Sequence, residues 1–298
     1  MPSLSAKAMA ALLGLLGPTR RLRSAEATLA QITALQIRPG SCAPPKRLDR
    51  TVELSARSVK GWPLYTVTPR GGSSRRRALY SHGGAWFLEI MPVHWQLIAR
   101  LAAATGTQFT VPVYPLLPAS SAASVIPVIS DLVSELLDEV GAEHVTIMGD
   151  SAGGTITLAV ALQLRDRGLP APHRTILISP ALDLAFSDPA IAEIAPNDPV
   201  LGAPGLRAVA PMWRGELALD DPLVSPLHGD LRGLAPITLF SGTYDILNAD
   251  ARRLVRKAAA AHLPLDYHEA PGLCHDYPLL PIPEAREARS VMERALRE

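Results

Sequence analysis

Cysteine, net charge and metal-binding motifs are scarce in this 298-residue sequence, and each scarcity excludes a class of protein. Two cysteines, Cys42 and Cys274, cannot build a disulfide framework, so we expect reduced thiols in a cytoplasmic protein. A formal net charge of +1 removes the electrostatic basis for binding nucleic acid, because there is no basic excess to release counterions. The eight histidines form no cluster with metal-ligand spacing, so neither a metal nor another cofactor is expected.

The N-terminal segment contains an apolar stretch, residues 8–16, that loosely imitates a signal peptide. The stretch is too short to span a bilayer, and no small-x-small cleavage site follows it. We therefore expect an amphipathic helix that packs on the body of the protein. The arginine clusters at residues 20–23 and 75–77 are expected to be solvated turns or helix faces rather than binding patches.

The order of strand-like and helix-like segments predicts an α/β fold. Two helical stretches in residues 1–37 precede a linker, and residues 51–59 and 64–68 are expected to form a hairpin. From residue 76 onward, short apolar runs alternate with helical stretches, which favours a mostly parallel central sheet flanked by helices. These strands are expected at residues 76–81, 108–112, 144–148, 175–179, 237–241 and 265–269, and the helices at 92–104, 122–140, 155–167, 249–261 and 283–297.

One interval interrupts this alternation. Nearly sixty residues separate the strand that ends at residue 179 from the strand that begins at residue 237, far more than an ordinary crossover needs. We expect residues 183–216 to form a partly helical lid above the carboxyl ends of the strands, where ligands bind in such sheets.

Residues 145–154, Val-Thr-Ile-Met-Gly-Asp-Ser-Ala-Gly-Gly, place an apolar strand, a tight turn and a helix in immediate succession. A serine at such a turn is held in a strained backbone conformation with its hydroxyl above the sheet. Gly149 and Gly153 supply the small flanking residues that the close approach of strand and helix requires. Ser151 is therefore the expected nucleophile, and the N–H of Ala152 is expected to donate to an oxyanion.

A serine nucleophile needs a base oriented by an acid, and in this type of fold the acid and then the histidine follow the serine. Of the five histidines after Ser151, His275 alone lies in a loop beyond the C-terminal end of a strand. Asp245 follows another strand end and is the expected acid, with Asp183 as the alternative. Asp276, next to the base, is expected to accept a local hydrogen bond.

His82-Gly83-Gly84-Ala85-Trp86 directly follows the expected strand at residues 76–81, and glycines there let backbone N–H groups converge on an oxyanion. With this segment included, the chain resembles the hormone-sensitive-lipase-like family of esterases, also called bacterial family IV or the α/β-hydrolase fold-3 group. The matching features occur in the family's order: His82-Gly83-Gly84, residues 149–154, Asp221-Pro222 with Ser225-Pro226, residues 242–247 and residues 272–275.

The resemblance implies a single α/β-hydrolase domain, residues 1–298, with a helical cap formed by about residues 1–40 and 183–216. It also implies carboxylesterase or lipase-like activity on short to medium acyl esters. The triad implied by the family motifs consists of Ser151, Asp245 and His275. The implied oxyanion donors are the N–H groups of Gly83, Gly84 and Ala152.

The sequence departs from the family pattern at two places. Ala85 replaces the usual third glycine, so a methyl group is expected to crowd the substrate pocket. The family's Tyr-Arg-Leu-Ala-Pro segment is Tyr-Pro-Leu-Leu-Pro here, at residues 114–118, without the arginine. Trp86, Phe186 and Trp213 are candidates for the substrate walls, although each could equally pack in the core or the lid.

Two alternative functions use the same scaffold. A non-catalytic ligand-binding protein, like the plant hormone receptors that resemble this family, would be expected to lack a triad member, and all three are in place here. An enzyme with the same machinery could instead cleave an amide, a lactone or a carbonate. The expected partners are a small-molecule ester and water, without nucleic acid or an integral membrane segment, and a homodimer is left open.

Overall fold

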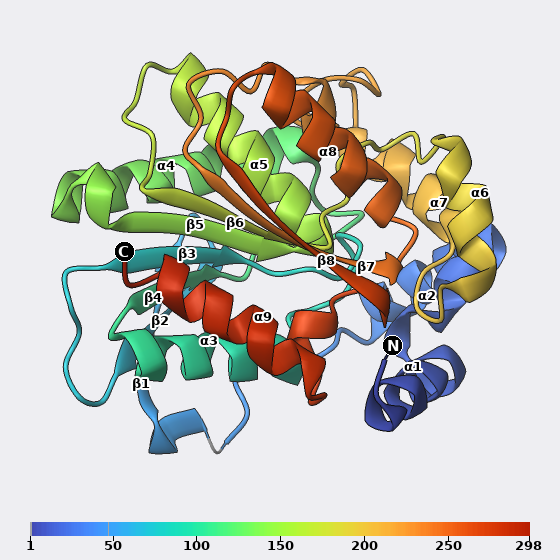
Figure 1. Ribbon diagram of the computed structural model, residues 1–298, viewed down its shortest axis with the longest axis horizontal. Helices are drawn as coiled ribbons and strands as arrows, with labels where there is room; N and C mark the ends of the chain where they lie inside the picture. Colours follow the sequence, from blue (N-terminus) through green and yellow to red (C-terminus); the bar gives the residue numbers. More distant parts are fainter. Residues whose placement is uncertain (1, 47) are drawn as a thin grey trace.

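The computed structural model describes residues 2–46 and 48–298. Its centre is an eight-stranded sheet in the order β1-β2-β4-β3-β5-β6-β7-β8 (Figure 1). Strand β2 pairs antiparallel with β1 and β4, and all other neighbours pair parallel, so the expected mostly parallel sheet is confirmed. The strands are β1 (Val52–Val59), β2 (Trp62–Pro69), β3 (Arg77–Ser81), β4 (Gln108–Pro112), β5 (Val145–Asp150), β6 (Arg174–Ile178), β7 (Ile237–Tyr244) and β8 (Leu265–Cys274).

Helices cover both faces of this sheet, α3 and α9 on one face and α4, α5 and α8 on the other (Figure 1). All six residues of the central strand β5 are buried as a result. The α-helices are α1 (Leu4–Leu16), α2 (Ala25–Ile37), α3 (Pro92–Thr105), α4 (Ala122–Val140), α5 (Ser151–Asp166), α6 (Pro189–Ile194), α7 (Ala203–Arg214), α8 (Asn248–Ala260) and α9 (Glu284–Ala295).

Local sequence signals fix the ends of the crossover helices. Helix α3 begins at Pro92, whose restricted φ suits a first helical turn, and ends before Gly106, which adopts a left-handed conformation with φ 73°. Helix α4 begins after Ser121, whose backbone N–H donates to the Ser124 hydroxyl at 2.9 Å. These boundaries return the chain so that strands β3 to β8 present their carboxyl ends at one edge of the sheet.

Several elements extend beyond their predicted bounds, helix α5 and strand β8 the most. Helix α5 begins at Ser151 rather than at residue 155. Gly153 and Gly154 lie in its first turn and pack closely against Ser81 and Pro180, so the helix starts directly after the strand without a longer loop. Strand β8 continues to Cys274 rather than to residue 269. The pairing of β7 with β8 shifts register between Gly242 and Tyr244. This shift accommodates Pro271 and Gly272, so that Tyr244 still pairs with Cys274.

The N-terminal helices and the insertion gather at one end of the molecule, on the right in Figure 1. Helix α7 packs closely on this segment, since a side chain at Gly205 would collide with Leu22 and Thr28. The guanidinium of Arg23 also donates to the carbonyl of Pro199 at 3.2 Å. The sequence predicts that helix α1 is amphipathic, and this prediction is wrong. Leucines lie on its solvent side as well as on its inner side.

Candidate active site

Ser151 lies at the turn between strand β5 and helix α5 with φ 52°, a conformation that an ordinary side chain adopts only under strain. The turn is tightly enclosed. A Cβ atom at Gly149 would collide with the Gly153 backbone, and one at Gly153 would collide with the Ser81 carbonyl. The sharp turn, which only small flanking residues allow, lifts the Ser151 hydroxyl away from the sheet.

Three strand ends bring Ser151, His275 and Asp245 together. Asp245 follows β7 and His275 follows β8, as the sequence predicts. The Ser151 Oγ lies 3.0 Å from Nε2 of His275, and Nδ1 of His275 lies 2.9 Å from Oδ2 of Asp245. All three residues are buried. These contacts have the order and lengths of a nucleophile, a base and an orienting acid.

A second carboxylate contacts the imidazole of His275. Asp276, in a left-handed conformation with φ 53°, places Oδ2 3.1 Å from Nε2 of His275, the same nitrogen that faces Ser151. The Asp276 N–H donates to the Ser179 hydroxyl at 3.1 Å, which fixes the backbone at this position. Asp276, which the sequence predicts to be a local acceptor, therefore contacts the imidazole of His275.

The carboxylates determine the charge of His275. Burial disfavours the imidazolium, but the charges of Asp245 and Asp276 outweigh burial and raise the pKa of His275 well above its ordinary value. Burial also raises the pKa of Asp276, to about 7, against the opposing effect of His275.

Asp198, in the insertion, was not found by sequence reasoning. Its Oδ2 accepts the N–H of Ile246 at 2.8 Å, and its Oδ1 accepts the N–H groups of Val200 and Leu201. Burial and the nearby charge of Asp245 raise the pKa of Asp198 to about 6. One side chain therefore connects the insertion to the loop that holds Asp245.

The alternative acid, Asp183, lies outside this group. Its Oδ2 pairs with the guanidinium of Arg253 at 2.8 Å, and its Oδ1 accepts the N–H of Ala185 at 3.0 Å. These partners place Asp183 in a structural ion pair rather than beside His275.

The segment after β3 is held by a buried carboxylate that the sequence did not identify. Asp150 accepts the N–H of Gly83 at 3.0 Å and Nε2–H of His94 at 3.1 Å on Oδ2, and the hydroxyl of Tyr80 at 2.6 Å on Oδ1. The N–H of Met91 donates to Nδ1 of His94, which places the ring proton on Nε2. Burial opposes ionisation of Asp150, but His94 and Tyr80 outweigh burial and lower its pKa.

This contact bears on the expected oxyanion hole. The N–H of Gly83 already donates to Asp150, and Gly83 does not line the cavity above Ser151, so its expected role as an oxyanion donor does not fit the geometry. Gly84 and Ala85 do line that cavity. Within the described residues, the N–H groups of Gly84, Ala85 and Ala152 have no acceptor in the protein.

The two departures from the family pattern, at Ala85 and at residues 114–118, both lie beside this cavity or next to the glycine motif. Ala85 adopts φ 50°, which explains why glycine suits the position, and its methyl group reaches the cavity as expected. The Tyr114 hydroxyl donates to the His82 carbonyl at 2.7 Å, and the Leu117 N–H donates to the Trp86 carbonyl at 2.9 Å. The segment at residues 114–118 therefore supports the glycine motif without an arginine.

A cavity of about 320 Å³ opens above Ser151 and His275. The expected aromatic walls are absent from it. Trp86 stacks on Trp213 with ring centroids 5.4 Å apart, and both rings, like Phe186, are fully buried away from the cavity. The apolar lining comes from the N-terminal segment, the start of helix α3, the insertion and the region after His275: Leu13, Leu22, Met91, Pro92, Val93, Val200, Leu201, Leu206, Leu279 and Leu280.

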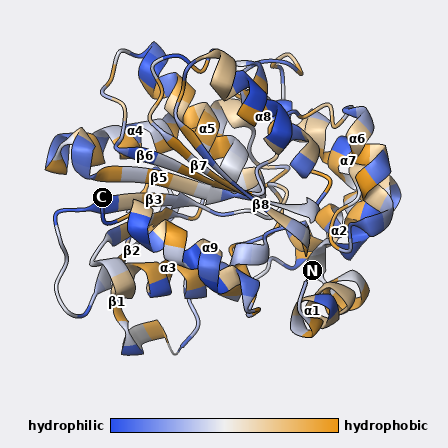
Figure 2. Cartoon of the chain, viewed as in Figure 1, coloured by the Kyte–Doolittle hydropathy of each residue, from blue (hydrophilic) through white to orange (hydrophobic). Residues whose placement is uncertain are grey.

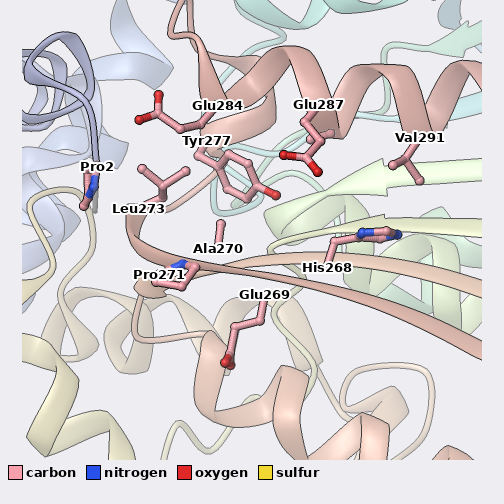
Figure 3. Close-up of a pocket in the computed structure, with 11 residues that line it drawn as sticks. Pro2, His268, Glu269, Ala270, Pro271, Leu273, Tyr277, Glu284, Glu287 and Val291 are labelled. Carbon is pink, nitrogen blue, oxygen red and sulfur yellow. The ribbon is translucent and has the colours of Figure 1, made fainter.

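A second cavity, of about 280 Å³, lies between strand β8 and helix α9 (Figure 3). Its lining includes Glu284 and Glu287 but no triad residue. Among the described residues, no set of His, Cys, Asp and Glu side chains could hold a metal ion. No helix within residues 2–46 and 48–298 has the length and apolar character needed to cross a membrane.

This chain is similar to known hydrolases with an alpha/beta fold. The profile of a family described as having the alpha/beta hydrolase fold, Abhydrolase_3, matches residues 78–279. A triacylglycerol lipase of Mycobacterium tuberculosis is 32% identical over 245 residues, which cover 81% of this chain and 51%, about half, of that protein. An acetyl-hydrolase of Streptomyces hygroscopicus is 33% identical over 230 residues, which cover 74% of this chain and 75% of that protein.

A solved structure agrees with the fold over the whole length. The crystal structure of an esterase from the bacterial hormone-sensitive lipase family matches with a TM-score of 0.82 and 24% identity. The match covers 100% of this chain and 98% of that structure. The likeness extends to the helices outside the sheet as well as to the sheet itself.

Proposed function

Because the chain belongs to the alpha/beta-hydrolase family Abhydrolase_3 and is a hydrolase of the carboxylesterase and lipase class, we propose that it cleaves carboxylic esters through an acyl-enzyme on Ser151. The observation that carries the proposal is the hydrogen-bonded series Ser151, His275 and Asp245 at the floor of a cavity. The geometry satisfies what nucleophilic catalysis by serine requires.

In the acylation step, Nε2 of His275 accepts the proton of the Ser151 hydroxyl as Oγ attacks the ester carbonyl carbon. Asp245 holds the imidazole with its proton on Nδ1 and stabilises the imidazolium that forms. The N–H groups of Gly84, Ala85 and Ala152 donate to the oxyanion, with Ala85 in the place first expected for Gly83. The oxyanion then collapses, the bond between the carbonyl carbon and the ester oxygen of the leaving group breaks, and His275 donates its proton to that oxygen, so the alcohol leaves.

In the deacylation step, water enters beside Nε2 of His275, which accepts one of its protons as the water oxygen attacks the acyl carbon. The second oxyanion collapses, the bond to Ser151 breaks, and His275 returns the proton to Oγ. The carboxylic acid leaves, and the enzyme is restored without a metal or a redox cofactor in any step.

We propose short to medium acyl esters as substrates. The cavity of about 320 Å³ is near the small end of the 300–1,000 Å³ typical of ligand sites. Leu22 and Leu201 are among its walls, so about residues 1–40 and 183–216 would act as the cap that limits acyl length. Cytoplasmic location and homodimerisation stay predictions.

A series of p-nitrophenyl esters tests both the chemistry and the acyl length. Turnover is expected to be highest for short to medium acyl chains and to fall for long chains and emulsions, because the aliphatic walls limit the cavity. Preincubation with a fluorophosphonate should label the protein stoichiometrically and abolish turnover.

The matched control is Ser151→Ala, which should lose both labelling and turnover while it stays folded. Stoichiometric labelling that persists in this variant would place the nucleophile elsewhere. A preference for long-chain emulsions would contradict the proposed acyl length but not the mechanism. If the intact protein is not labelled and does not turn over any ester, the proposal that it is a serine esterase is wrong.

The second carboxylate predicts a shift in pH dependence. Activity requires neutral His275, whereas Asp276 and Asp245 both favour its charged form. Asp276→Asn should therefore move the ascending limb of the pH profile of kcat/KM to lower pH, with up to about tenfold higher activity near pH 7, where Asp276 becomes charged. Asparagine tolerates the left-handed backbone at this position. An unchanged limb would show that Asp276 does not act on the base.

A further inference from the structure

Helix α1 presents apolar side chains to solvent. Leu4 is 84% exposed and Leu16 is 76% exposed. Most of the exposed residues of the helix are apolar, with Ser5 and Lys7 as the polar ones: Leu4, Ser5, Lys7, Ala8, Ala11, Leu12, Leu15 and Leu16. Figure 2 shows the contrast with helix α8, an outer helix with broad hydrophilic bands. A surface helix ordinarily turns polar residues outward, so the outer face of α1 is suited to an apolar environment.

The apolar exposure is confined to a small part of the molecule. Six of the eight large hydrophobic side chains that are exposed in the described part of the chain belong to residues 4–37. The remaining two, Leu219 and Tyr244, lie far from this segment in the sequence. We call the outer side of residues 4–38 the cap face.

The cap face is also basic. Residues 1–38 contain five basic side chains and one acidic side chain, whereas the whole chain has a net charge of only +1. Arg20, Arg21 and Arg38 are exposed, and among the described residues none of the three pairs with a carboxylate. Together with Leu15 and Leu16 they line a cleft of about 730 Å³.

The inner side of the same segment forms part of the catalytic cavity. Leu13, Thr19 and Leu22 line it together with Ser151 and His275. The exposed leucines and the reacting serine are therefore on opposite sides of one short segment.

We propose that the cap face docks on an anionic lipid interface. The exposed leucines would enter the boundary between headgroups and acyl chains, and the arginines would pair with lipid phosphates. A second copy of the chain fits this face less well, because two-fold self-association would bring two basic clusters together. Docking does not depend on catalysis, but with the proposed ester hydrolysis it would bring lipid-dissolved esters to the cavity.

Sedimentation of the full chain with phosphatidylcholine vesicles, with and without phosphatidylglycerol, tests the proposal. We expect binding to the anionic vesicles and much weaker binding to the neutral ones. The double variants Leu15→Ser with Leu16→Ser and Arg20→Gln with Arg21→Gln should each lower the affinity about tenfold or more. The matched control Leu219→Ser should bind like the unmodified protein, and all variants should keep kcat/KM on a water-soluble ester.

Other outcomes are distinguishable. Equal binding to neutral and anionic vesicles, or none to either, overturns the proposal. If the Leu15 and Leu16 variant instead dissociates a dimer in gel filtration and leaves vesicle binding unchanged, the occupant is a second copy and the proposal also fails. Vesicle binding by a protein that hydrolyses no ester would overturn the proposed function while leaving the docking surface in place.

Discussion

Asp245→Asn should lower kcat by about 10⁴-fold while leaving the protein folded. Oδ2 of Asp245 lies 2.9 Å from Nδ1 of His275, and Oδ1 accepts the N–H of Leu247 at 2.9 Å. An asparagine can keep its oxygen on Leu247 and turn its amide toward Nδ1. His275 would then carry its proton on Nε2 and could no longer accept the proton of Ser151. Steady-state kinetics on a p-nitrophenyl ester measure the loss.

The matched control is Asp183→Asn, which changes the other aspartate that follows a strand in the sequence. Asp183 pairs with Arg253 and does not contact His275, so kcat should stay close to the unmodified value at a temperature where the variant is folded. Comparable losses in the two variants would argue against a specific role for Asp245.

Asp150→Ala should lower both stability and activity. The change leaves the hydroxyl of Tyr80, the N–H of Gly83 and the ring N–H of His94 buried without their acceptor. We expect a loss of about 3–5 kcal/mol in the free energy of unfolding, measured by urea denaturation. We also expect kcat to fall about 10²–10³-fold, because the segment that positions the oxyanion donors loses its anchor.

Asp150→Asn separates these two effects from simple loss of charge. Its oxygen can accept from Gly83 and His94, and its amide can donate to the oxygen of Tyr80, so most of the stability should return. An alanine variant as stable and as active as the unmodified protein would contradict this role for Asp150.

The catalytic contacts could be predicted because each depends on a local rule. Parallel strands end at one edge of the sheet, so a serine, an aspartate and a histidine that each follow a strand converge there. The strand-turn-helix pattern around Ser151 depends on glycines at fixed positions, and the sequence displays those positions directly. The order of elements along the chain likewise predicts the sheet, since alternation is a local signal.

The supporting contacts could not be predicted because they join residues far apart in the chain. Asp198 reaches the N–H of Ile246 across 48 positions, and Asp150 reaches Nε2 of His94 across 56. Nothing in the local pattern around either aspartate identifies its partner. Trp86 adjoins the glycine motif, yet only tertiary packing against Trp213 determines that it turns away from the cavity.

The order of the strands gives the active site a place in the folding of the chain. His275 follows β8, which is the last strand in the sequence and lies at the edge of the sheet, beside β7. Ser151 and Asp245 can be positioned by strands β5 and β7, but the base arrives only when the C-terminal strand pairs. A nascent or partly refolded chain should therefore have no hydrolase activity until its final strand is in place, so the onset of activity reports the pairing of β8.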